Sequence, residues 1–278
     1  MDSLYRTPSG EKAIQDFYSR ILAKWTWPHQ ERYINTRFGR TFIIESGPAS
    51  APVLILQHDA GSNSLSWSGD IPLFARHFRV IALDIPGDPG RSAPNRLSWQ
   101  DNSYAEWLDE ALTSLSLTRV SLLGLSQEGR NALKYATYRH QKVEKLVLLS
   151  PAGVTRDRSS FLIKAIWFSL LGMRGRRSLI KMTFGKIPAD PEAVAFMELI
   201  FTHYRSRFDS LQLFKATDLK KLIMPVLLVG GKLDAIRDVT AIELRLNQHL
   251  PQLKSRIYPD RGHVLVNIAG DILPFLAH

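Results

Sequence analysis

The sequence predicts an α/β fold built on a mostly parallel, eight-stranded sheet with helices on both faces. Wholly apolar runs such as residues 53–57 and 143–149 are typical of parallel strands buried on both sides. Stretches of helical period separate these runs, which is the pattern of repeated strand–helix units. Residues 152–217 interrupt this alternation with one helical stretch after another. We therefore expect one core, formed by residues 1–151 and 218–278, with a helical segment inserted after the sixth strand.

The individual elements follow from apolar spacing and turn residues. The first two strands flank Gly39-Arg40, which predicts a hairpin. The expected strands are residues 33–38, 41–45, 53–57, 80–83, 120–123, 143–149, 224–230 and 255–258. The expected helices are residues 10–24, 104–117, 132–137 and 265–276 in the core, and 161–171, 178–184 and 191–204 in the inserted segment.

Composition excludes several classes of protein. The 278 residues include no cysteine, which excludes disulfides, thiolate catalysis and Cys-ligated zinc. No window reaches the ~18–20 uncharged apolar residues of a membrane span, so we expect no stable membrane insertion. The net charge is +10, but no run of five Lys or Arg and no nucleic-acid motif is present, so we expect no nucleic-acid partner. The first residues lack the pattern of a signal peptide, which favours a cytoplasmic location.

One stretch carries the chemistry. Between the strand at 120–123 and the helix at 132–137 stands Gly124-Leu125-Ser126-Gln127-Glu128-Gly129. A serine between a strand and a helix, with glycines close by, is typical of a nucleophile on a sharp turn. The hydroxyl stands clear of the sheet there, and the free N–H groups of the helix start face developing negative charge.

At this stretch the chain resembles the α/β-hydrolase family, whose turn reads Gly-x-Ser-x-Gly. Gly124 and Ser126 match that motif, but Glu128 stands where the family has its second glycine. The resemblance covers essentially the whole chain and is nearest to bacterial carboxylesterase-like members. It implies that the inserted residues 152–217 form a helical cap over the active site, which would exclude water and supply apolar walls.

The loop after the third strand also resembles the family. His58, Gly61 and Trp67 fit the family pattern, whereas Asp59 replaces a usual glycine. The resemblance implies that the backbone N–H groups of Ala60 and Gln127 form the oxyanion hole. We interpret His58 as a structural histidine that braces the loop.

A serine nucleophile needs a histidine base and an acid that fixes the tautomer of the histidine. In α/β-hydrolases these residues follow in the order Ser, Asp, His. Ser126, Asp234 and His263 each follow a predicted strand in that order. We therefore expect them at the carboxyl edge of the sheet, where open α/β sheets bind ligands. A histidine base also predicts that activity falls as the pH drops through roughly 6 to 7.

These features predict a serine hydrolase that cleaves a small carboxylic ester through an acyl-enzyme, without metal or cofactor. A non-catalytic binder of a small ligand, a peptidase and a C–C bond hydrolase remain open alternatives, as does a homodimer. The expected partner is a small-molecule ester, and Trp67, Trp167 and Phe168 are candidate substrate contacts.

Two acids stand where the family has glycines, Asp59 and Glu128. One hypothesis is that they lie near each other and near the developing oxyanion, where negative charge would oppose the transition state. The other interpretation is that Glu128 points into solvent along its helix.

Overall fold

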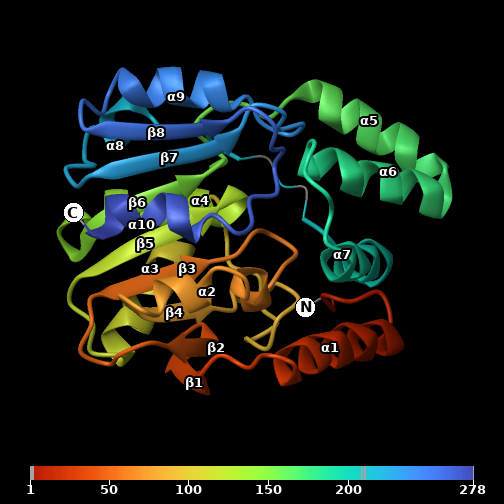
Figure 1. The fold of residues 1–278 in the computed structure, drawn as a ribbon, viewed down its shortest axis with the longest axis horizontal. Helices are drawn as coiled ribbons and strands as arrows, with labels where there is room; N and C mark the ends of the chain where they lie inside the picture. The colour runs from red at the N-terminus through yellow and green to blue at the C-terminus, as the bar shows by residue number, and fades with distance from the viewer. Residues whose placement is uncertain (1–2, 208, 210, 278) are drawn as a thin grey trace.

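A computed structural model describes residues 3–207, 209 and 211–277. One eight-stranded sheet runs through the molecule in the order β1-β2-β4-β3-β5-β6-β7-β8 (Figure 1). Strand β2 is antiparallel to both of its neighbours, and the pairs from β4 through β3 to β8 are all parallel. The predicted fold class is therefore confirmed.

The strands lie close to their predicted positions. They are β1 Gln30–Thr36, β2 Gly39–Ser46, β3 Val53–Gln57, β4 Arg79–Leu83, β5 Val120–Leu125, β6 Val143–Leu149, β7 Val226–Gly231 and β8 Leu253–Tyr258. The helices are α1 Pro8–Ala23, α2 Ile71–Phe74, α3 Ser103–Ser114, α4 Ser126–Tyr138, α5 Ser159–Leu170, α6 Gly172–Phe184, α7 Pro191–His203, α8 Ala216–Leu219, α9 Val239–Asn247 and α10 Ala269–Ala277.

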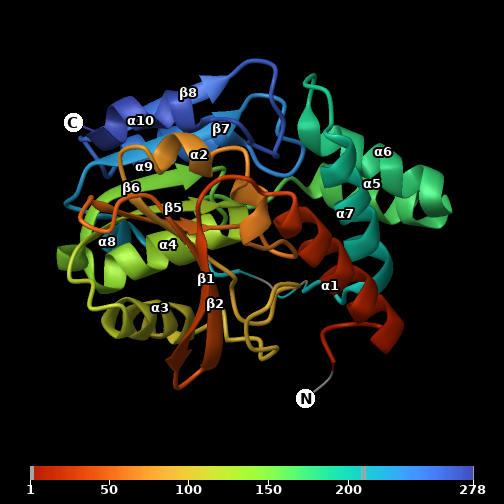
Figure 2. The ribbon, with the colours of Figure 1, turned by 60° about the horizontal axis from the view of Figure 1, so that its bottom comes forward.

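The alternation of side chains along the central strands forms two core layers. In β3, Ile55 packs into a layer that includes residues of α3, α4 and α9. Its neighbours Leu54 and Leu56 point the other way, into a layer with residues of α1, α2 and α10. Figure 2 shows α3 and α4 on the face of the sheet opposite α2 and α10. Burial on both faces explains why these strands are apolar without alternation.

The hairpin turn differs from the prediction. Gly39 and Arg40 already belong to β2, and the two residues between the strands are Arg37 and Phe38. The physical reason is the conformation of Gly39, whose φ of 105° closes the turn from its last position. A side chain there would also meet Ala93, because a Cβ atom would lie 2.6 Å from the Ala93 Cβ.

Helices α5, α6 and α7 lie together at one end of the sheet, and α1 runs beside α7 (Figures 1 and 2). The rings of Phe17 and Phe196, 5.5 Å apart, join α1 to α7. Lys24 and Glu192 form an ion pair of 2.8 Å across the same contact. We use the name helical segment for α5–α7. None of the helices in the described part of the chain is both long enough and apolar enough to cross a bilayer.

Backbone hydrogen bonds tie the helical segment to the loop after β8. The Val264 N–H donates to the Thr183 carbonyl at 2.9 Å, and the Gly262 N–H donates to the Phe184 carbonyl at 3.2 Å. Gly185 also forms an isolated bridge with Arg261. The end of α6 is therefore paired with the residues on both sides of His263.

Candidate active site

Ser126 occupies a strained position at the start of α4. Its φ is 58°, a left-handed conformation that costs a non-glycine residue about 1–2 kcal/mol. The turn is tight because β5 and α4 meet closely: a Cβ atom on Gly124 would lie 2.6 Å from the Glu128 carbonyl oxygen, and one on Gly129 would lie 2.9 Å from the Gly124 carbonyl oxygen. The glycine that permits this approach is therefore residue 129, and position 128 is free to carry a side chain.

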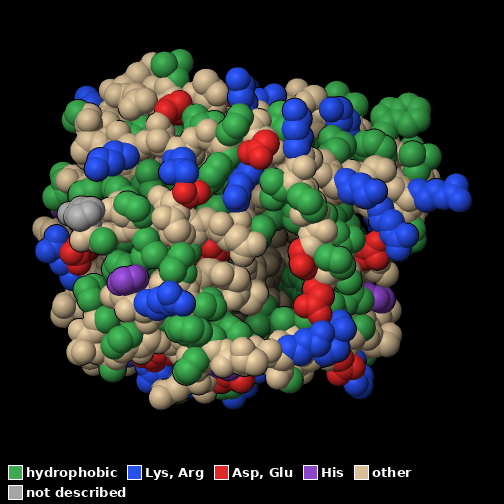
Figure 3. All heavy atoms as spheres, in the orientation of Figure 1, with side chains coloured by type: hydrophobic (Ala, Val, Ile, Leu, Met, Phe, Trp, Pro, Cys, Tyr) green, Lys and Arg blue, Asp and Glu red, His purple; other side chains and the backbone are tan. Residues whose placement is uncertain are grey.

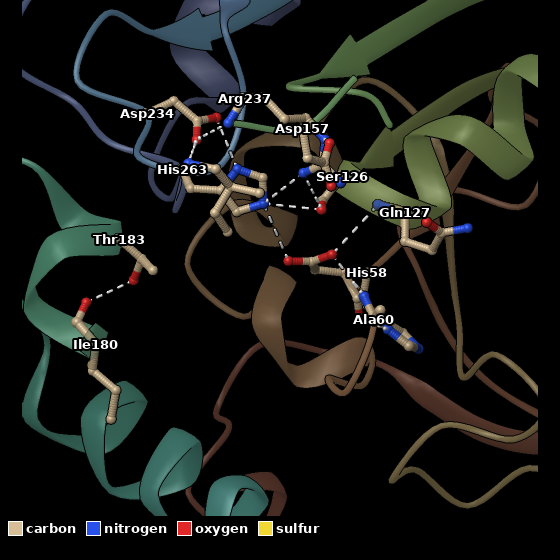
Figure 4. A network of polar contacts seen from close by, with 12 residues as sticks. His58, Ala60, Ser126, Gln127, Asp157, Ile180, Thr183, Asp234, Arg237 and His263 are labelled. Atoms are coloured by element: carbon tan, nitrogen blue, oxygen red, sulfur yellow. Dashed lines mark hydrogen bonds and ion pairs between the residues drawn. The ribbon is translucent and has the colours of Figure 1, made fainter. Parts of the chain in front are cut away.

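The structure brings Ser126, His263 and Asp234 into one hydrogen-bonded row (Figure 4). The Ser126 Oγ lies 2.9 Å from His263 Nε2, and His263 Nδ1 lies 2.8 Å from an Asp234 carboxylate oxygen. The other Asp234 oxygen accepts the N–H groups of Ile236 and Arg237 at 2.8 and 2.9 Å. Each of the three residues follows a strand of the parallel sheet, so all of them meet at its carboxyl edge.

Charge within this row shifts two pKa values. Burial opposes ionisation of Asp234, but the charge and hydrogen bond of His263 and the two backbone N–H groups outweigh it and lower the pKa to about 2. Burial alone would lower the pKa of His263, but Asp234 and the carboxylate of Asp59 raise it to about 9. His263 is therefore charged at neutral pH in this arrangement, and the expected transition between pH 6 and 7 moves to higher pH.

The predicted oxyanion hole holds a carboxylate of the chain itself. One Asp59 oxygen accepts the Ala60 N–H at 2.7 Å and lies 3.5 Å from the Gln127 nitrogen. The other oxygen lies 3.6 Å from His263 Nε2. Partial burial opposes ionisation of Asp59, but the hydrogen bond and charge of His263 and the charge of Arg237 lower its pKa. The carboxylate thus lies where the acid product of an ester would lie, one oxygen on the backbone N–H groups and one toward the histidine.

Arg237 is a site residue that the sequence interpretation missed. Its guanidinium Nη1 donates to the Ser126 Oγ at 2.8 Å and lies 3.1 Å from His263 Nε2 (Figure 4). The residue is 5% exposed. A basic residue three positions after the predicted acid was the available signal, because the turn that caps Asp234 carries residue 237 back toward the histidine.

Glu128 does not point into solvent, so that interpretation was wrong. It is 1% exposed, and Asn131 donates to its carboxylate at 2.6 Å. Burial, followed by the charge of Asp88, raises the pKa of Glu128 well above its ordinary value. Its buried surroundings therefore oppose ionisation of this acid behind the nucleophile, whereas the carboxylate in the oxyanion hole is that of Asp59.

His58 braces the loop as predicted. Its Nδ1 lies 2.8 Å from the Asp59 carbonyl oxygen, and its Nε2 accepts the Ile85 N–H at 3.0 Å. Both bonds are satisfied by a neutral ring that carries its proton on Nδ1. His58 therefore orients the residue whose carboxylate fills the oxyanion hole.

The three aromatic residues predicted to contact the substrate differ in their exposure. Trp67 is 1% exposed within the packed core, so it offers a substrate no accessible surface in this state. Trp167 is 67% exposed on α5, which does not support a role as a pocket wall. Phe168 is half-buried on the same helix and stays a prediction. Figure 3 shows the surface hollowed between the sheet and the helical segment.

The site combines a strained serine, a histidine in contact with it, and an acid in contact with the histidine, all at the carboxyl edge of a mostly parallel sheet. This is the arrangement found in the α/β class of serine hydrolases. A family model described as the alpha/beta hydrolase family matches residues 53–271, and the chain belongs to that family.

Among proteins of this family, the chain is similar to the carboxylesterase YbfK of Bacillus subtilis. The two are 30% identical over 257 residues, which cover 89% of this chain and 86% of the relative. The crystal structure of that carboxylesterase superposes with a TM-score of 0.85 at 27% identity and covers 96% of this chain and 98% of its own. The naproxen esterase of the same organism shares the fold, with a TM-score of 0.86 at 23% identity over 98% and 99% of the two chains.

Proposed function

We propose that this protein is a serine carboxylesterase that cleaves a small carboxylic ester through an acyl-enzyme intermediate. The observation that supports it most directly is the contact of Ser126 Oγ with His263 Nε2 at 2.9 Å, together with the contact of His263 Nδ1 with Asp234 at 2.8 Å. The similarity to carboxylesterases over most of the chain supports an ester as the substrate.

In the first half of the proposed reaction, neutral His263 takes the proton of Ser126 while the Oγ atom bonds to the ester carbonyl carbon. The carbonyl electron pair moves onto oxygen and forms an oxyanion. When the intermediate collapses, the bond to the leaving alcohol breaks, and His263 gives that alcohol its proton. Asp234 accepts the Nδ1–H of His263 throughout and stabilises the transient positive charge.

In the second half, His263 takes a proton from water as the water oxygen attacks the acyl carbon. Collapse breaks the bond to Ser126, returns the proton to its Oγ atom and releases the acid. These steps need neither a metal nor a cofactor. An oxyanion-hole N–H group contributes roughly 3 kcal/mol to such a reaction. The Asp59 carboxylate must therefore leave the N–H groups of Ala60 and Gln127 before either tetrahedral intermediate forms.

The rival function is a non-catalytic binder on the same fold, and the occupied oxyanion hole favours it. Labelling with a fluorophosphonate separates the two functions, because this reagent modifies only an activated serine. We expect labelling of the wild type at pH 8–9 and none of Ser126→Ala. We also expect hydrolysis in a panel of esters of graded acyl length, with a loss of at least about 10³ in Ser126→Ala. A folded wild type that neither labels nor hydrolyses any ester would contradict the proposal.

A further inference from the structure

Arg237 places a buried positive charge next to the reacting atoms. Its Nη1 lies 2.8 Å from the Oγ atom that would carry the acyl group. The charge of Arg237 opposes the rise in the pKa of His263, but no step of the proposed ester reaction requires it, because the serine, histidine and acid already account for the proton transfers. A buried guanidinium is costly unless it is paired, so its presence here calls for an anionic partner.

The protein supplies that partner only in part. The Asp157 carboxylate lies 3.3 Å from Arg237 Nε, but 49% of its side chain is exposed and the Nε–H makes no aligned hydrogen bond with it. The charge of Arg237 helps to lower the pKa of the Asp59 carboxylate, so the guanidinium and this carboxylate attract each other. When Asp59 leaves the oxyanion hole, as the reaction requires, the guanidinium loses this nearby anion. A substrate can replace it.

We propose that Arg237 is a specificity-determining residue that selects esters whose acyl part carries a carboxylate close to the scissile carbonyl. This inference rests on the proposed ester chemistry. The 2.8 Å between Nη1 and the Ser126 Oγ limits the reach. A carboxylate within about three bonds of the acyl carbon can meet the guanidinium, whose planar donors fit a carboxylate with two hydrogen bonds. Half-esters of short dicarboxylic acids have this chemistry.

Two further observations favour an anionic substrate. The Asp59 carboxylate shows that the space over Ser126 accommodates an anion against the Ala60 N–H and His263. Residues 152–217 carry 11 Lys and Arg against five Asp and Glu, an excess of six out of the net charge of +10. Figure 3 shows Lys and Arg side chains on the side of the helical segment, with Asp and Glu side chains nearer the hollow. The net positive charge of the molecule raises the local concentration of anions.

The test compares two methyl esters of equal length. Monomethyl succinate carries a carboxylate, and methyl levulinate carries a neutral ketone at the same place. Proton release gives kcat/KM for each ester with the wild type, Arg237→Gln and Arg237→Lys. Arg177→Gln is the matched control, because Arg177 lies on α6 with 62% of its side chain exposed and pairs with Glu198. That variant removes one positive charge from the helical segment and leaves the residues around Ser126 unchanged.

We expect the wild type to prefer the succinate ester. Arg237→Gln should lower the ratio of kcat/KM for the succinate ester to kcat/KM for the levulinate ester by about tenfold or more, because any change at Ser126 or His263 affects both esters alike. Arg237→Lys should keep part of the preference, and Arg177→Gln all of it. An equal loss on both esters in Arg237→Gln, or a preference that survives it, would overturn the inference.

A binding measurement keeps this inference separate from the ester proposal. Calorimetric titration of Ser126→Ala with monomethyl succinate does not depend on turnover. We expect affinity that falls about tenfold or more when Arg237→Gln is added, and equal, weaker affinity for methyl levulinate in both variants. If the wild type hydrolyses both esters equally, only the specificity inference fails. If it hydrolyses neither, the ester proposal fails, and equal binding of succinate with and without Arg237 would overturn the carboxylate site as well.

Discussion

Replacing Asp59 with glycine should activate the enzyme. In the structure the Asp59 carboxylate accepts the Ala60 N–H at 2.7 Å and must be displaced by the ester oxygen. A hydrogen bond to a charged group contributes about 1.5–3 kcal/mol. Each 1.36 kcal/mol corresponds to a factor of ten in rate, so emptying the oxyanion hole should raise kcat/KM by about tenfold to 100-fold.

The same substitution should shift the pH profile. The carboxylate lies 3.6 Å from His263 Nε2 and helps to raise the pKa of that histidine to about 9. Only neutral His263 acts as the base, so kcat/KM of the wild type should rise with pH through about 9, and not through 6 to 7. An opposite charge at this distance shifts a pKa by about one unit or more. Asp59→Gly should therefore move the rise to lower pH and add about another tenfold at pH 7.

The assay is hydrolysis of a neutral aryl ester between pH 6 and 10, with circular dichroism to verify folding. Asp59→Asn separates the two effects, because it removes the charge but leaves an oxygen that can accept the Ala60 N–H. It should shift the profile with a smaller gain at its plateau. Asp16→Asn is the control, since Asp16 is exposed on α1 and pairs with Lys12. A folded Asp59→Gly variant with an unshifted profile and an unchanged or lower kcat/KM would refute this reasoning.

Three other changes test the electrostatics and the pocket. Glu128→Gln should alter kcat/KM by less than about threefold, because burial already opposes the charge on this acid. It should raise Tm more at pH 8 than at pH 4, because at pH 8 the acid ionises freely in the unfolded chain, whereas the folded protein opposes its charge. His263 has a pKa of about 9 in the folded protein against an ordinary value of 6.5. Its protonation therefore stabilises the folded state by an amount on the order of 3 kcal/mol, which is fully present below pH 6.5 and is lost as the pH rises through 9. Thermal unfolding at pH 6 and 9.5 should show a larger drop in the wild type than in His263→Ala. Shortening Phe168, but not the exposed Trp167, should change the preferred acyl length; equal effects of both would contradict the assignment of these two side chains.

The arrangement of the backbone could be predicted because it depends on repeating physical patterns. The apolar run of β3 was predicted with its observed bounds, Val53–Gln57, because a strand buried on both faces is uniformly apolar. The meeting of Ser126, Asp234 and His263 followed from topology, since side chains after parallel strands share one edge. The turn forms although Glu128 replaces the second glycine of the family motif, because Gly129 allows α4 to approach Gly124 closely.

The charges within the site could not be predicted in the same way. Whether Asp59 points to solvent or into the oxyanion hole depends on one side-chain rotation in a loop, which no periodicity encodes. Arg237 is near the nucleophile because the turn after β7 reverses over Asp234. Burial of Glu128 depends on how α4 packs against the rest of the molecule, so a sequence pattern that fits a solvated helix start was misleading.

The pairing of α6 with the loop after β8 has a mechanical consequence. The carbonyl groups of Thr183 and Phe184 hold Val264 and Gly262, the two neighbours of His263. A movement of the end of α6 would therefore also move the residues on both sides of His263, and with them the imidazole. A ligand that displaced the end of α6 would also lengthen the distance from His263 Nε2 to the Ser126 Oγ atom. The position of the acyl group and the ability of His263 to act as the base are therefore coupled.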